Sequence, residues 1–188
     1  MRPGTLALAV TGGTPVLLHR MRRELLLDGR LSAPTATAMY GVYTAHALAV
    51  AVTARRRSLP LPGGATATST ALGAGAVAIG SGLVVAGMSR FVGPAQVSGT
   101  DSGELATGGV YRLSRNPQYA GYVLALAGLG LARRSGAVLM LAAGAGGVFA
   151  WWVPVEERAL RPTFGAPYEH YLARTPRWLG RPRREGTT

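Results

Sequence analysis

Apolar and polar stretches alternate along the 188 residues in a pattern that predicts a bundle of helices. Arginine-rich or glycine-rich connectors separate five apolar runs, at residues 5–18, 35–54, 66–88, 119–131 and 137–153. A helix that crosses the hydrocarbon core of a bilayer needs about 20 apolar residues, and the run at 66–88 reaches this length without a charge. The pattern therefore predicts an all-α, polytopic membrane helix bundle with about five transmembrane helices.

The first run and the last two runs are shorter than this length. The run at 5–18 contains Gly12, Gly13 and Pro15, and no A-x-A-like site follows it, so a short first helix is favoured over a signal peptide. The runs at 119–131 and 137–153 are joined by Arg133 and Arg134. We expect a C-terminal helical hairpin whose arginines reach the membrane surface at its tip.

Composition and charge support a membrane protein and argue against other classes. Apolar residues make up 48% of the chain and charged residues only 15%, a balance typical of polytopic membrane proteins. The formal net charge of +12 comes from arginines clustered between apolar runs, not from a basic face on a soluble fold, so no nucleic-acid partner is expected. The chain has no cysteine, and His19, His46 and His170 are far apart in sequence, so no metal site is predicted.

The distribution of arginines predicts the orientation of the five helices. With a cytoplasmic C-terminus, the connectors at 20–34 and 90–116 and the tail share one side, and that side holds most of the arginines. The cluster at 55–57 opposes this bias. We therefore expect a multi-pass protein of the cell membrane, surrounded by lipids, with its site on the cytoplasmic side. Residues 1–188 would form one domain, with N-terminal spans at 1–89 and a cofactor-binding part at 90–188.

Two polar stretches flank the predicted hairpin and contain the residues with candidate chemistry. The first, at 105–121, reads L-x-T-x-G-x-Y-x-x-x-R-N-P-x-Y-x-G, and the second, at 156–171, reads E-E-x-x-L-x-x-x-F-G-x-x-Y-x-x-Y. In this order and spacing they resemble the signatures of the isoprenylcysteine carboxyl methyltransferases and, more loosely, of their phospholipid methyltransferase relatives. The resemblance covers about the last 90 residues.

This resemblance implies an integral membrane methyltransferase that uses S-adenosylmethionine. A carboxylate suits the ammonium group or ribose of that cofactor, tyrosines suit its adenine or sulfonium, and a glycine-rich loop exposes backbone N–H groups. The resemblance implies cofactor contacts from Gln96, Glu104, Leu105, Ala106, Tyr111, Asn116, Pro117, Gln118, Tyr119 and Glu156.

Two departures from the family pattern bear on the acceptor. Many members have histidine at the position of Asn116, and asparagine cannot titrate near neutral pH. Trp152 stands where the prenylcysteine enzyme has an arginine that is important for substrate. We therefore expect a lipophilic small-molecule or lipid-like acceptor that is methylated on oxygen, sulfur or nitrogen. The residues that we expect to contact it are Arg115, Tyr122, Trp152 and Glu157; no residue is assigned a catalytic role.

Alternatives remain open at this point. The chain is alternatively a membrane reductase on a related scaffold that uses NADPH, or a membrane protein without enzymatic activity whose polar loops bind a partner. Glu157 and Arg161 have the i,i+4 spacing of a helix-surface ion pair. Trp151, Trp152 and the neighbouring tyrosines also fit an interfacial aromatic belt.

Overall fold

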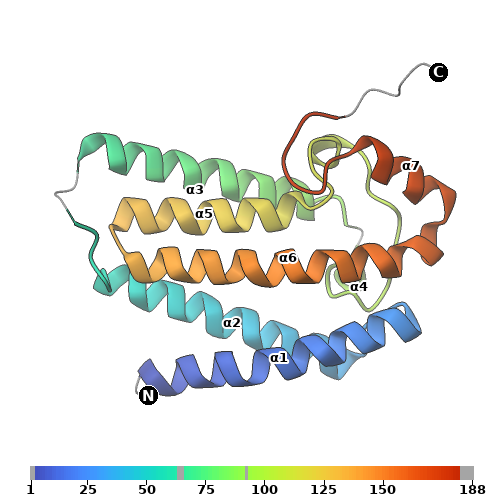
Figure 1. Ribbon diagram of the computed structural model, residues 1–188, viewed down its shortest axis with the longest axis horizontal. Coiled ribbons are helices and arrows are strands. Elements are labelled where there is room, and N and C mark those ends of the chain that lie inside the picture. The colour runs from blue at the N-terminus through green and yellow to red at the C-terminus, as the bar shows by residue number, and fades with distance from the viewer. Residues whose placement is uncertain (1–2, 63–65, 92, 183–188) are drawn as a thin grey trace.

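Five long helices run side by side and alternate in direction (Figure 1). The computed structural model describes residues 3–62, 66–91 and 93–182. In these residues it has seven α-helices, one short 3-10 helix and no β-strand, as the apolar pattern predicts. The elements are α1 (Pro3–Asp28), α2 (Ala33–Arg56), α3 (Ala67–Met88), α4 (Pro94–Val97), η1 (Gly109–Arg112), α5 (Pro117–Arg133), α6 (Gly136–Phe164) and α7 (Ala166–Arg174).

Two of the sequence-based helix boundaries are wrong. Helix α1 continues through the expected polar connector to Asp28, because no glycine or proline interrupts residues 16–28; the turn comes at Gly29, whose φ is +69°. Helix α6 likewise continues past residue 153 through Pro154 and Pro162, and it ends only at Gly165, whose φ is +56°. Trp152, Val153, Val155, Glu157 and Ala159 are buried along this part of α6.

Helices α3 and α5 approach each other through glycines spaced seven residues apart. Gly73, Gly80 and Gly87 are buried on α3, and Gly121 and Gly128 face them from α5. A Cβ atom at residue 80 would lie 2.5 Å from the Gly121 carbonyl oxygen, so only glycine permits this distance between the backbones. Small residues on facing helices let the two backbones approach this closely.

At the end of the bundle opposite α7, the α5–α6 turn is bonded to the loop after α2. The Ser135 hydroxyl donates to the Ser58 carbonyl over 2.9 Å, and the backbone N–H of Gly136 donates to the Leu59 carbonyl over 2.8 Å. Arg133 donates to the Ala54 carbonyl over 3.3 Å. Hydrogen bonds to backbone carbonyls therefore hold the α5–α6 turn against the end of α2 and the loop after it.

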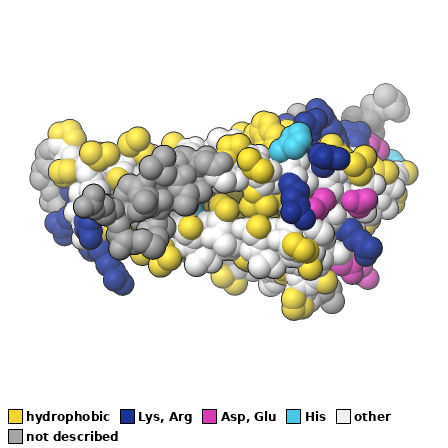
Figure 2. Space-filling view, turned by 90° about the horizontal axis from the view of Figure 1, so that it is seen from below, with side chains coloured by type: hydrophobic (Ala, Val, Ile, Leu, Met, Phe, Trp, Pro, Cys, Tyr) yellow, Lys and Arg dark blue, Asp and Glu magenta, His cyan; other side chains and the backbone are white. Residues whose placement is uncertain are grey.

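Two of the described helices are long and apolar enough to cross a membrane, α3 and α6. Only 17% of the apolar window of α3 and 33% of that of α6 is buried inside the structure, whereas a core helix of a soluble protein would be mostly buried. Figure 2 shows charged side chains gathered toward the two ends of one face, and apolar and uncharged atoms over the described surface between them. The other three spans stay predictions.

The glycine packing gives a prediction about stability. Gly80→Ala should lower the free energy of unfolding by about 1–3 kcal/mol, because the new methyl group overlaps backbone atoms of α5. Gly82→Ala is the matched control on the same helix, because its Cβ would meet no atom within 4 Å. Thermal unfolding of both variants in detergent measures the difference. Equal midpoints would show that α3 and α5 do not pack through Gly80.

Candidate active site

The two polar stretches meet at the end of the bundle that carries α7 (Figure 1). Residues 94–116 form a loop that contains α4 and η1, and α5 begins directly after it at Pro117. Proline at this position favours a helix start because its missing N–H is not needed there. The second stretch begins within α6 and continues into α7. The predicted convergence of these segments is therefore present in the fold.

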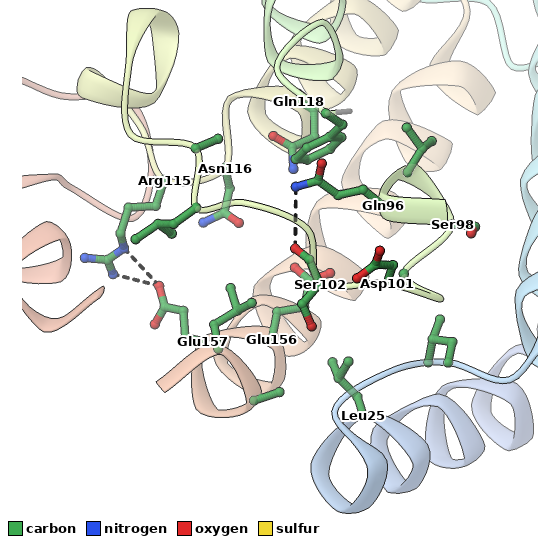
Figure 3. A pocket seen from close by; sticks show the side chains of 18 of the residues that line it. Leu25, Gln96, Ser98, Asp101, Ser102, Arg115, Asn116, Gln118, Glu156 and Glu157 are labelled. Carbon is green, nitrogen blue, oxygen red and sulfur yellow. Dashed lines mark hydrogen bonds and ion pairs between the residues drawn. The ribbon is translucent and has the colours of Figure 1, made fainter. Parts of the chain in front are cut away.

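A cavity of about 390 Å³ lies between these segments, within the range typical of small-molecule sites. Nine of the ten predicted cofactor residues line it. The exception is Pro117, which is buried at the start of α5 beside Gly87. Figure 3 shows Arg115 and Glu157 on one side of the pocket, Gln96 and Ser102 on the other, and Glu156 between them.

Glu156 and Tyr119 form a direct hydrogen bond that joins α6 to α5. The Tyr119 hydroxyl donates to a Glu156 carboxylate oxygen over 2.8 Å. The Tyr119 ring stacks on Phe149, with centroids 4.4 Å apart and planes 18° apart. The stack and the hydrogen bond hold the tyrosine and the carboxylate in fixed positions, and both line the cavity.

The opposite wall is a loop whose backbone is shaped around Gln96. The Gln96 amide nitrogen donates to the Glu104 carbonyl over 3.0 Å and to the Ser102 carbonyl over 3.5 Å. Gly103 has a φ of +57°, and a Cβ there would overlap the Gln96 amide group. Glycine at this position therefore allows the loop to fold over the glutamine and to bring Glu104 to the cavity.

Three tyrosines pack together where η1 meets α7. Tyr111, Tyr168 and Tyr171 are buried in one cluster. The Tyr171 hydroxyl donates to the Tyr111 carbonyl over 2.8 Å, and the Tyr111 hydroxyl donates to the Gln118 side-chain oxygen over 3.2 Å. Burial raises the pKa of each of these three phenols above its usual range, so they stay neutral hydrogen-bond donors.

Glu157 binds two arginines from different parts of the chain. Arg115 approaches its carboxylate to 2.7 Å and Arg177 to 2.6 Å. Arg115 also donates to the carbonyls of Leu172 and Thr175, over 3.0 and 2.8 Å. The cluster thus joins the first polar stretch, α6 and the segment after α7.

This arrangement corrects one interpretation of the sequence. Glu157 does not pair with Arg161 at i+4; Arg161 instead binds Glu169 on the surface, at 2.6 Å. Arg177, from the tail, binds Glu157 although its own side chain is 43% exposed. Nothing in the sequence distinguishes Arg177 from the other tail arginines, so its partner was not predictable.

Asn116 is held by the same C-terminal segment. It is buried, its side-chain nitrogen donates to the Arg177 carbonyl over 3.1 Å, and its backbone N–H donates to the Ser114 hydroxyl over 3.0 Å. Ser114 is fully buried and also donates to the Arg177 carbonyl, over 3.3 Å. Asn116 therefore has a structural role in the described contacts and also lines the cavity.

The remaining predicted acceptor residues lie in different surroundings. Trp152 is 6% exposed and lines the cavity, whereas Trp151 is 47% exposed, as an interfacial anchor would be. Tyr122 does not line the cavity; its hydroxyl lies 3.2 Å from the Nδ1 atom of His46 on α2. This hydrogen bond joins α5 to α2. No described group of three or more His, Asp or Glu side chains is arranged to hold a metal.

A comparison with protein families matches residues 68–167 to the family described as phospholipid methyltransferase. The match covers just over half of the chain, including the whole first polar stretch and most of the second. The chain belongs to the phospholipid methyltransferase family. This family is part of the isoprenylcysteine carboxyl methyltransferase-like group of membrane methyltransferases, so the resemblance is confirmed. No match was found among curated proteins or among solved structures.

Part of the cavity lies outside the residues that match the family. The ends of α1 and α2 near the cavity contribute apolar and aromatic side chains that sequence reasoning missed. They are Met21, Leu25, Leu31, Met39, Tyr40 and Tyr43. Apolar residues at helical spacing look alike whether they face lipid, a core or a cavity, so the sequence carries no signal that separates these cases.

The Glu157 cluster gives a second prediction. Glu157→Gln should lower the free energy of unfolding by about 3 kcal/mol, because the side chains of Arg115 and Glu157 are only 12% and 9% exposed and an uncompensated guanidinium would remain. Glu169→Gln removes the surface pair, whose side chains are 51% and 50% exposed, and should cost less than about 1 kcal/mol. Thermal unfolding and hydrogen exchange of residues 175–182 measure both effects. Similar losses in the two variants would contradict a joining role for Glu157.

Proposed function

We propose that this membrane methyltransferase binds S-adenosylmethionine in the described cavity and transfers its methyl group to a lipophilic small-molecule or lipid-like acceptor. The observation that carries the proposal is the cavity itself. It combines the polar groups of both signature stretches with an apolar side made by α1, α2 and Trp152. A polar cofactor and an apolar acceptor would need these two kinds of surface next to each other.

The groups around the cavity fit the cofactor. Glu156 offers a carboxylate for an ammonium group or ribose hydroxyls, and the Gln118 side chain offers an amide. Tyr111 and Tyr119 offer aromatic surface for adenine or for the cationic sulfonium. This set of carboxylate, amide and aromatic groups matches the ammonium, ribose, adenine and sulfonium parts of the molecule.

S-adenosylmethionine, held beside Glu156, Tyr111 and Tyr119, would supply an electrophilic methyl group for transfer to a lone pair of the acceptor. The protein's contribution is chiefly to position the acceptor in line with the methyl carbon. An anionic acceptor, such as a thiolate or a carboxylate, needs no base. A neutral acceptor releases its proton to water at the polar edge of the cavity, beside Asp101 and Ser102.

The side chain of Trp152 favours an acceptor without a carboxylate at this point. Its indole packs with Met21, Leu31, Met39 and Val155 and contributes to the cavity wall. An arginine there would offer a carboxylate a charged partner, whereas the indole offers apolar contact or a face for a cation. An apolar acceptor would reach such a wall from the bilayer without crossing water.

The proposed topology has five spans, with the site on the cytoplasmic side of the cell membrane. It is supported by the alternating direction of α1, α2, α3, α5 and α6, which gathers the connectors after α1 and α3 and the segment after α6 at one end (Figure 1). That end also holds most of the arginines outside the helices.

Binding of the cofactor tests the proposal. Titration of the purified protein in detergent should detect S-adenosylmethionine, and Glu156→Ala should weaken binding by roughly 1.5–3 kcal/mol through loss of a charge-assisted hydrogen bond. Glu169→Ala, which removes a carboxylate outside the cavity, is the matched control. Binding of NADPH and not of S-adenosylmethionine would favour a reductase. Full affinity in a folded Glu156→Ala variant would remove Glu156 from the site.

Single cysteines test the orientation, because the natural chain has none. Cysteines at the exposed positions 112 and 179 should react with a membrane-impermeant maleimide only from the cytoplasmic side, and one at exposed position 59 only from the other side. A cysteine at position 135, in the α5–α6 turn, would not report the outer side, because Ser135 is fully buried and the reagent could not reach it. Thr187, in the tail, lies outside the described residues. Labelling of positions 112 and 179 from opposite faces would rule out one site built from both stretches.

A further inference from the structure

The end of α1, the turn at 29–32 and the start of α2 form an elbow, residues 21–39, that closes one side of the cavity. Met21, Leu25, Leu31 and Met39 of the elbow line the cavity. Figure 3 shows Leu25 on α1 directed toward the pocket. These residues precede the part of the chain that matches the family, so this wall is a property of this chain's own N-terminal half.

The apolar wall adjoins the polar part of the site. Met21, Leu31 and Met39 are buried in one cluster with Trp152 and Val155 of α6. Tyr119, which donates a hydrogen bond to Glu156, packs against this cluster. An apolar group held by the elbow would therefore continue into the region of the signature residues.

One carboxylate fixes the shape of the elbow. Glu24 accepts hydrogen bonds from the Ser32 backbone N–H at 2.9 Å, the Ser32 hydroxyl at 3.0 Å, the Thr35 hydroxyl at 2.7 Å and the Arg20 Nε at 2.9 Å. Partial burial opposes its ionisation, but these hydrogen bonds outweigh that effect and lower the pKa of Glu24 to about 2. The charged carboxylate thus ties α1 to the first turn of α2.

The elbow is also bonded to the loop that carries predicted cofactor residues. The backbone N–H of Leu31 donates to the Gly99 carbonyl over 2.8 Å. Gly99 has a φ of +71°, and the Leu31 side chain packs close to it. A Cβ atom at residue 99 would lie 3.4 Å from the Leu31 Cδ1 atom. A displacement of the elbow would therefore move both the apolar wall and the loop between α4 and η1.

We propose that the elbow is the specificity wall for an alkyl chain of the acceptor, and that Glu24 is the positioning residue that holds this wall in place. The proposal rests on the proposed function. Methionine and leucine side chains adapt to flexible apolar groups and offer no hydrogen bond that would select one headgroup. The wall would therefore favour acceptors by the length of their unbranched chain. Each methylene buried there would improve binding up to roughly fourfold.

A cysteine in the wall tests this without methyl transfer. Leu25→Cys places a thiol at the cavity, and Leu27→Cys places one at a position on α1 that is 74% exposed and outside the cavity. Both are alkylated with N-ethylmaleimide and N-octylmaleimide. The ratio of the octyl to the ethyl rate should be about tenfold larger at position 25, because only that site buries the longer chain. Equal ratios would overturn the proposal.

Variants around the carboxylate then test the role of Glu24 in the Leu25→Cys protein. Glu24→Gln should lower the ratio to the value found at position 27. Arg20→Ala, which removes only the partner whose side chain is 56% exposed, should leave the ratio unchanged. Thr35→Val removes one of the hydrogen bonds to Glu24, from a fully buried position, and should lower the ratio part-way. This milder variant keeps the test possible if Glu24→Gln does not fold. A lower unfolding midpoint with an unchanged ratio would make Glu24 merely structural and overturn its positioning role.

The outcomes separate this proposal from the proposed function. Absence of S-adenosylmethionine binding in the parent protein contradicts the proposed function, whatever the maleimide rates. Binding of the cofactor together with equal rate ratios at positions 25 and 27 contradicts the specificity wall alone.

Discussion

The site end of the molecule depends on one carboxylate that two arginines share. Glu157 lies on α6, Arg115 lies just before α5, and Arg177 lies after α7. Arg115 and Asn116 also bind carbonyls of the C-terminal segment, so charge and backbone hydrogen bonds act on the same connection. Without this cluster, α7 and its tyrosines would be held to η1 mainly by apolar contact.

Glu156 and Glu157 are adjacent and both line the cavity, but they differ in their partners. Glu157 meets two guanidinium groups, whereas Glu156 accepts a hydrogen bond from a tyrosine hydroxyl. Adjacent residues on a helix point about 100° apart, which directs the first carboxylate to Tyr119 and the second to the arginines. Glu156 therefore joins α6 to α5, and Glu157 joins α6 to the segments before α5 and after α7.

Sequence reasoning found what is encoded locally and missed what depends on packing. The apolar helices and the hairpin turn at Arg133 and Arg134 follow from the local pattern of apolar and charged residues. The continuation of α6 to Phe164 and the partner of Arg177 depend on contacts between segments far apart in sequence. The wall at Met21 and Met39 was missed because a methionine on an apolar helix face gives no sign of a cavity beside it.

The length of α6 has a mechanical consequence. Its 29 residues extend about 44 Å, well beyond the roughly 30 Å of a bilayer's hydrocarbon core. The surplus lies beyond residue 153, where the apolar run ends and the polar signature begins. One continuous helix therefore carries both carboxylates out of its apolar part, so their distance from the α5–α6 turn is set by the rigid rise of a helix and not by a flexible loop.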